Sequence, residues 1–150
     1  MDITVAEIDG LLIVSLNGTD DGIDQETFNE IMREKTSGGY RNIIIDCGCG
    51  LSSCTKQTIL HFARVRYETG NLVAFVGGKE NASLGGGTEL HAPMLPFFAA
   101  LRDAATYCQS MEERSQAERE AGIAGFLDVL AKMLNGNGDI LLEEGRTNDA

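Results

Sequence analysis

Three consecutive isoleucines, Ile43 to Ile45, constrain the fold more than any other feature of the sequence. They belong to a short run, Asn42 to Asp46, in which apolar residues occupy successive positions and do not alternate with polar ones. A strand of that kind has to be covered on both faces, so it lies centrally in a sheet between helices. The run therefore predicts an α/β domain.

Two further regions extend the predicted sheet. Leu72 to Val76 is a second buried strand, and a helix from about Thr55 to Glu68 separates it from the first, which predicts a right-handed crossover and a parallel strand pair. Near the N-terminus, Ile3 to Ile8 and Leu11 to Leu16 flank an Asp9-Gly10 step, which is a strong hairpin signal. Together they predict a mixed sheet of four to five strands with an N-terminal β-hairpin and helices packed on it.

The remaining segments predict more helices and one short strand. A helix is expected after Asp24, whose carboxylate suits an N-cap position. Pro93 to Leu101 is expected to form a short helix, and Ala105 to Cys108 a short fifth strand. A final, extended helix is expected to begin at Ser110, and apolar residues at helical spacing continue it to about Leu134.

The length of 150 residues suits one domain with an appendage and leaves no room for a second catalytic domain. We expect the α/β domain over residues 1–119, a C-terminal helical extension over 120–136 and a flexible tail over 137–150. The apolar stripe of the extension has to be buried, either by packing back on its own sheet or against another molecule. Both options remain open from the sequence.

The formal net charge of −11 excludes two classes of partner. Nucleic acids and anionic membrane surfaces require a positive field, so proteins or small molecules are the expected partners. The N-terminal residues lack the basic flank and apolar run of a signal peptide, and no apolar stretch approaches the roughly 20 residues that span a bilayer. A cytoplasmic protein is therefore expected.

Catalytic and metal-binding patterns receive little support. Cys47, Cys49 and Cys54 follow a C-x-C-x4-C spacing that matches no standard zinc pattern, and the favoured interpretation is small apolar thiols packed at a strand end. A metal site or cysteine-dependent enzyme built on these three residues remains the alternative. His61 and His91 have no evident catalytic partners. We expect neither an enzyme nor a bound cofactor.

The glycine-rich segment 77–88 has a superficial likeness to a phosphate-binding P-loop. In that motif Ser or Thr follows Gly-Lys, whereas here Glu80 follows Gly78-Lys79 and the GxxxxGK spacing is missing. A surface loop is the simpler prediction.

Three stretches carry a resemblance to a known family. They are the apolar strand Leu11 to Gly18 with Asp21 and Phe28 after it, the acidic-ended strand Asn42 to Asp46, and Ser110 to Glu113. The last is similar to the Ser-apolar-Glu-Glu start of the family's final helix. In this order the stretches resemble the STAS domain, the family of sulphate-transporter C-terminal domains and bacterial anti-sigma factor antagonists.

The resemblance spans about residues 2–119 and implies a bacterial regulator of transcription that binds a kinase-like anti-sigma factor. Antagonists of this family carry Asp-Ser-(Ser or Thr)-Gly-Leu at the head of the second helix, and the partner kinase phosphorylates the first serine. The best alignment places Thr55 at that serine, and Ser52 and Ser53 are candidates if the alignment slips. The aspartate and the glycine of the motif are absent here.

The resemblance and the charge pattern together suggest the partner-binding residues: Asp20, Asp21, Asp24, Asp46 and Lys56. A phosphate would add roughly −1.5 to −2 charges close to such carboxylates and so weaken docking. Lys56 has no counterpart in the family motif and would pair with the phosphate or stand in for it. The alternative function is a non-phosphorylated STAS scaffold that forms a homo-oligomer through its C-terminal helix.

Overall fold

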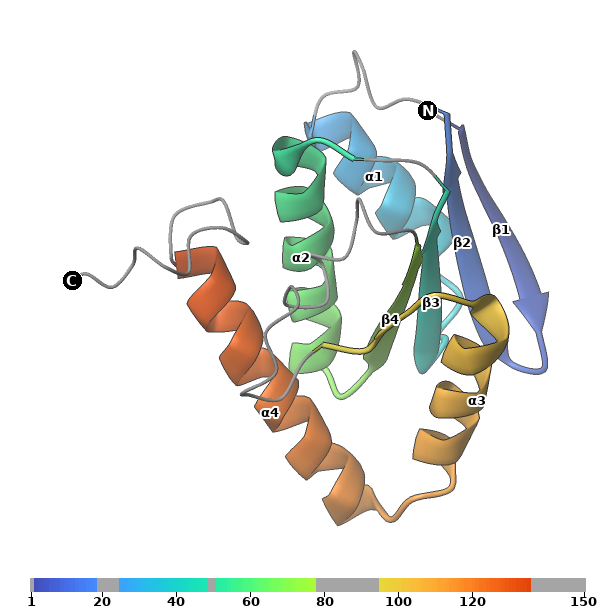
Figure 1. Ribbon diagram of the computed structural model, residues 1–150, viewed down its shortest axis with the longest axis vertical. Helices are drawn as coiled ribbons and strands as arrows, with labels where there is room; N and C mark the ends of the chain where they lie inside the picture. The colour runs from blue at the N-terminus through green and yellow to red at the C-terminus, as the bar shows by residue number, and fades with distance from the viewer. Residues whose placement is uncertain (1, 19–24, 49–50, 78–94, 136–150) are drawn as a thin grey trace.

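The structure is a computed structural model and describes residues 2–18, 25–48, 51–77 and 95–135. The elements follow in the order β1 (Asp2–Ile8), β2 (Leu11–Asn17), α1 (Gln25–Lys35), β3 (Asn42–Cys47), α2 (Ser53–Glu68), β4 (Leu72–Gly77), β5 (Phe97–Phe98), α3 (Leu101–Glu112) and α4 (Gln116–Asn135). The strands form one sheet in the order β1-β2-β3-β4-β5, in which β1 and β2 are antiparallel and all other neighbours are parallel (Figure 1). The predicted α/β fold with its N-terminal hairpin is confirmed.

Helices cover both faces of the sheet, as the isoleucine run predicts. Helix α3 packs on β3, β4 and β5, while α2 packs on β4, and both α1 and α4 pack against α2 (Figure 1). The Asn42 side chain reaches Glu112 of α3, so Asn42, Ile44 and Asp46 point to the α3 face. Ile43 and Ile45 point to the face that α1 and α2 cover.

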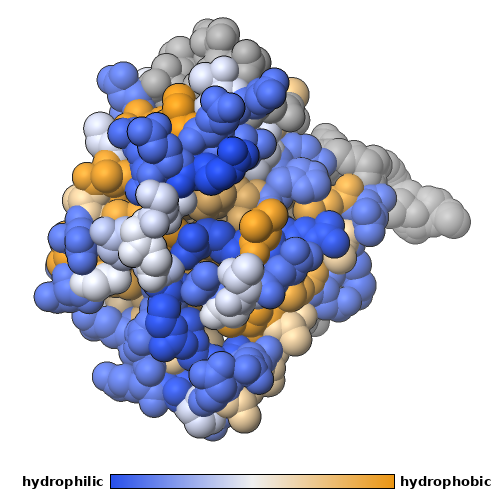
Figure 2. All heavy atoms as spheres, turned by 180° about the vertical axis from the view of Figure 1, so that it is seen from behind, coloured by the Kyte–Doolittle hydropathy of each residue, from blue (hydrophilic) through white to orange (hydrophobic). Residues whose placement is uncertain are grey.

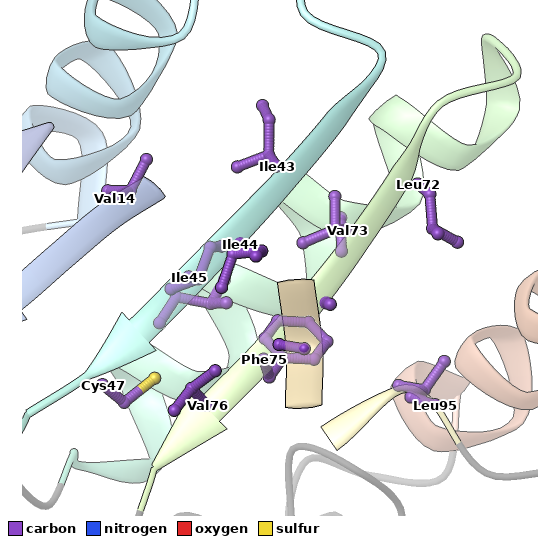
Figure 3. Close-up of a cluster of buried hydrophobic side chains, with 14 of the residues drawn as sticks. Val14, Ile43, Ile44, Ile45, Cys47, Leu72, Val73, Phe75, Val76 and Leu95 are labelled. Carbon is purple, nitrogen blue, oxygen red and sulfur yellow. The ribbon is translucent and has the colours of Figure 1, made fainter. Parts of the chain in front are cut away.

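The core lies around β3 and β4. Ile43, Ile44 and Ile45 are fully buried, and Figure 3 shows them beside Val73 and Phe75 of β4. Burial of this kind supplies most of the stabilisation of an α/β domain. The strand that the sequence singles out is therefore the centre of the hydrophobic core.

The hairpin joins β1 and β2 through two residues. Asp9 has φ 51° and Gly10 has φ 83°, the left-handed pair that a type I′ turn requires, and Ile8 lies opposite Leu11. The turn thus has the conformation that the Asp-Gly step predicts.

The predictions for residues 93–108 are wrong in two places. The fifth strand is Phe97–Phe98, where a helix was expected, and the Phe75 N–H donates to the Pro96 carbonyl at 2.8 Å at its start. Ala105 to Cys108 lies inside α3 and forms no strand. Ala104, Cys108 and Met111 are buried on one side of α3, so their helical spacing overrides the local strand preference of Thr106 and Tyr107.

The predicted start of the final helix is also wrong. Ser110 to Glu113 forms the end of α3, and the final helix α4 begins after Ser115. The Ser115 hydroxyl accepts the Glu118 N–H at 3.2 Å, and the Glu118 carboxylate accepts the Ser115 N–H at 3.4 Å. This reciprocal pair is a capping box. The sequence contains two Ser-x-x-Glu patterns in succession, and the second of them begins the helix.

Helix α4 crosses the expected boundary at residues 119 and 120 and joins the core. Ile123 and Leu130 are buried, and the ring of Phe126 lies 5.9 Å from that of Tyr67 in α2. Of the two options for its apolar stripe, the structure shows packing against the chain's own domain, on α2. The tail expected over 137–150 lies outside the described residues.

Candidate functional site at the N-terminus of α2

The site lies where β3 leaves the sheet. The C-terminal ends of the parallel strands β2, β3 and β4 share one edge, and α2 begins there (Figure 1). The Gly48 N–H donates to the Leu16 carbonyl at 2.8 Å, which continues the pairing with β2 beyond the last residue of β3. A Cβ at Gly48 would lie 2.5 Å from Asn17 Oδ1 and 3.0 Å from Leu16 O, so any larger residue would displace the Asn17 side chain and crowd the Leu16 carbonyl.

Ser52 is the N-cap of α2. Its backbone is extended, with φ −72° and ψ 164°, and its hydroxyl accepts the Thr55 N–H at 3.2 Å. The Ser52 carbonyl accepts the Lys56 N–H at 3.0 Å, which begins the helical hydrogen bonding. Ser52 remains exposed, so this cap places a hydroxyl on the surface at the positive end of the helix dipole.

The three hydroxyl candidates for phosphorylation differ in their surroundings. Thr55 is only 6% exposed, and its hydroxyl accepts a hydrogen bond from the Ser52 hydroxyl at 3.3 Å. Ser53 is the first residue of α2, and its side chain lies outside the described part of the chain. Ser52 and Thr55 therefore lie in contact, with Ser52 outside and Thr55 inside.

Of the expected partner-binding residues, the structure describes Asp46 and Lys56. Asp46 is half-buried and points to the α3 face, whereas Lys56 is half-buried on α2, which covers the opposite face. Asp20, Asp21 and Asp24 lie outside the described residues. The face drawn in Figure 2 is mostly hydrophilic, with smaller hydrophobic areas between the polar groups.

Asp46→Asn should stabilise the protein at neutral pH, with a gain in Tm that shrinks as the pH falls. Burial raises the pKa of Asp46, so the folded state favours the protonated carboxyl. The stability that this proton provides is fully present below the unfolded pKa and is lost as pH rises through the folded pKa. The amide imitates the protonated carboxyl at every pH. Thermal unfolding from about pH 3 to about pH 8 measures the difference, and Glu34→Gln controls for the loss of one charge. A gap in Tm that is constant over this range would contradict the prediction.

The cysteines do not share one environment. Cys47 is buried at the end of β3, whereas Cys54 is exposed on the first turn of α2. Cys108 is buried in α3, and burial raises the pKa of its thiol to about 12. Cys49 lies outside the described residues. Within the described ranges, no group of three or more His, Cys, Asp or Glu side chains is placed to hold a metal ion.

A polar cluster that the sequence did not predict lies at the opposite end of β3. Asn42 Nδ2 donates to Glu112 Oε2 at 2.6 Å, Arg119 Nη2 donates to Asn42 Oδ1 at 3.3 Å, and Arg41 Nη1 lies 3.6 Å from Glu112 Oε1. Asn42 and Arg119 are each 2% exposed. This Asn42 cluster, formed by Arg41, Asn42, Glu112 and Arg119, joins β3, α3 and α4, and part of it borders a pocket of about 700 Å³.

His61 is exposed on α2, and His91 lies outside the described residues. None of the helices in the described part of the chain has the length and apolar character that a bilayer crossing needs.

The antiparallel hairpin, the parallel β2-β3-β4 core and the helix that begins at the end of the central strand define a STAS-like fold. The chain is similar to a solved structure of RsbS from Moorella thermoacetica, a serine-to-glutamate variant, with a TM-score of 0.59 and 14% sequence identity. The likeness covers 76% of this chain and 100% of that one. No protein-family model matches the sequence, and no curated protein is similar enough to match.

Proposed function

We propose that this protein is an interaction regulator of the anti-sigma factor antagonist type, which binds a kinase-like anti-sigma factor through the N-terminus of α2. The observation that carries the proposal is Ser52, an exposed hydroxyl that caps the helix following the central strand of a STAS-like fold. The likeness to RsbS supports the fold, and the position of Ser52 supports the choice of site.

Among the candidate hydroxyls, Ser52 suits a kinase better than Thr55. Phosphoryl transfer requires the acceptor oxygen to approach the γ-phosphate in line, so the hydroxyl has to protrude from the surface. Thr55 is 6% exposed and lies beneath Ser52, so a kinase would have to unwind the first turn of α2 to reach it. We therefore assign the acceptor role to Ser52 in place of the aligned Thr55.

Phosphorylation at Ser52 would change both charge and shape at the docking surface. The phosphate adds roughly −1.5 to −2 charges and three acceptor oxygens. The N-terminus of α2 tolerates these charges, because its backbone N–H groups and helix dipole favour an anion. A partner that binds the neutral hydroxyl loses its contact and meets a chain whose formal charge of −11 has become more negative. The phosphorylated form should release the partner.

The acidic residues remain proposed contacts. Asp20, Asp21 and Asp24 follow β2 in the sequence, and Asp46 lies near the end of β3. Together with a phosphate on Ser52, these carboxylates would repel an acidic partner surface, in line with release on phosphorylation. Lys56, one turn into α2, is the proposed pairing partner of the phosphate.

Phosphosite mapping tests the proposal. The wild type, Ser52→Ala and Thr55→Val are each incubated with ATP and the serine kinase-like anti-sigma proteins of the source organism, and the modified residue is identified by mass spectrometry. We expect phosphate on Ser52 in the wild type and in Thr55→Val, none in Ser52→Ala, and release of the bound kinase on modification. Phosphate confined to Thr55, or no phosphate with any of these kinases, would overturn the switch.

The scaffold alternative has less apolar surface on the C-terminal helix than it needs. Oligomerisation through the C-terminal helix requires its apolar stripe to be available, and Ile123 and Leu130 of that stripe are buried in the core of the same chain, which leaves only its partly buried residues: Phe126, Leu127, Met133 and Leu134. We therefore rank the scaffold second.

A further inference from the structure

The strand β1 forms an open edge of the sheet. It is the first strand in the sheet order, and among the described residues no strand lies beyond it (Figure 1). Its pairing with β2 is regular from Asp2 opposite Asn17 to Ile8 opposite Leu11, without a bulge. Edge strands are usually protected by short length, charged side chains, proline or a bulge. The seven residues of β1 have no proline and no bulge, and their charged residues are Asp2 at the first position and Glu7, which accepts the Tyr40 hydroxyl of the same chain.

The turn determines which backbone groups of β1 face outward. A two-residue turn makes Ile8 and Leu11 a hydrogen-bonded pair, and such pairs recur at every second residue along an antiparallel ladder. The main chain of residues 2, 4, 6 and 8 therefore bonds to β2. The N–H and C=O groups of Ile3, Val5 and Glu7 point away from the sheet.

We propose that β1 pairs antiparallel with β1 of a second copy of this chain, about a twofold axis at Val5. In this register Val5 faces Val5 of the second copy and Ile3 faces Glu7, and both are hydrogen-bonded pairs. The remaining residues also find a partner in this register: Thr4 faces Ala6, and Asp2 faces Ile8. All seven residues pair, and the result is one continuous sheet across two chains.

The side chains of β1 are compatible with this register. Val5 is 42% exposed and Ile8 is 52% exposed, and pairing would cover both. No carboxylate lies directly opposite another, which would be unfavourable across a strand pair. The Tyr40 hydroxyl donates to Glu7 Oε1 at 3.1 Å, so the Glu7 charge is held within its own chain.

The charge of the chain determines how strong such a dimer can be. Two copies with a formal charge of −11 repel each other, and a single strand pair buries less than the roughly 1,600 Å² of a standard interface. The dimer should therefore be weak and should strengthen with ionic strength, because salt screens the repulsion. Two strands separate β1 from β4, on which α2 packs, so this surface is distinct from the one at Ser52.

Sedimentation equilibrium of the full chain, at low and high salt, tests the pairing with two variants. Val5→Pro removes an outward N–H and leaves the β1–β2 bonds intact, because the Val5 N–H points away from β2. Its dissociation constant should rise by roughly tenfold or more, since the twofold axis doubles the loss. Val5→Thr keeps the N–H and the branched side chain, and should dimerise like the wild type.

Hydrogen exchange of the wild type gives a readout that does not depend on any variant. The amides of Ile3, Val5 and Glu7 should become protected as concentration rises, while those of Thr4, Ala6 and Ile8 are protected at every concentration. A chain that stays monomeric at high concentration and high salt would overturn the proposal. So would a dimer in which the three outward amides exchange as fast as in dilute solution.

Discussion

Leu130→Ala is expected to lower the free energy of unfolding by about 2–5 kcal/mol, and Tm by roughly 5–15 °C. Leu130 is fully buried within α4, which packs along α2. Truncation to alanine removes apolar contacts and leaves a cavity that the rigid helix pair closes only in part. Urea denaturation should show one cooperative transition at a lower midpoint.

The size of this effect decides whether α4 belongs to the domain. If residues 120–136 were an extension that folds apart from the sheet, Leu130→Ala would leave the main transition unchanged. Lys132→Ala, on the exposed side of the same helix, is the matched control. Its ion pair with Asp128 spans 3.5 Å between exposed groups, and removing it should change stability by less than about 1 kcal/mol.

The strands were the part of the fold that the sequence predicted best. Ile43 to Ile45 and Leu72 to Val76 are apolar at successive positions, a pattern that occurs where helices cover both faces of a sheet. The Asp9-Gly10 step predicts a type I′ turn, and both residues adopt the positive φ that this turn requires. These signals are local, and the tertiary structure reinforces each of them.

The helix boundaries after residue 95 were not predictable in the same way. Ser110-x-x-Glu113 and Ser115-x-x-Glu118 both fit a capping box, and the pattern alone does not distinguish them. Burial decides between them. Met111 packs into the core as part of α3, so the chain has to finish that helix before α4 begins at Gln116.

The candidate site was inferred from its place in the fold, and the exposure of the hydroxyls then decided between Ser52 and Thr55. The sequence predicted that the functional surface lies between β3 and α2, and it named Ser52, Ser53 and Thr55 without ranking them by exposure. Alignment to the family motif favoured Thr55. The cap geometry distinguishes the hydroxyls, because an N-cap side chain turns back over the first turn and covers the residue three positions on.

The Asn42 cluster was not visible in the sequence at all. Its members are separated by up to 78 positions, from Arg41 to Arg119, and each is an ordinary polar residue by composition. Only the packing of α3 and α4 against the start of β3 brings them together. Long-range polar contacts of this kind leave no periodic signal in a single sequence.

Asn42→Leu is expected to lower the free energy of unfolding by about 2–4 kcal/mol. Arg119 is 2% exposed, Asn42 Oδ1 accepts its Nη2, and Nη1 has no partner within the described residues. Burial lowers the pKa of Arg119, and the nearby Arg41 lowers it further, so the guanidinium is already in an unfavourable environment. Removing the amide withdraws an acceptor from a buried charge.

The double variant Asn42→Leu/Arg119→Met should recover part of that loss. Replacing both buried polar partners by apolar side chains of similar size is often close to neutral, because neither leaves the other buried and unpaired. The Glu112 carboxylate loses the Asn42 amide, but it is 39% exposed and keeps Arg41 Nη1 at 3.6 Å. The two single substitutions should therefore be non-additive, and the double variant should be more stable than their sum predicts by about 1 kcal/mol or more. Urea denaturation of all four proteins measures the coupling, with Arg114→Met on the exposed surface as the control. Additive losses would mean that Asn42 and Arg119 stabilise the fold independently, and that the contact between them does not hold α4 to the sheet.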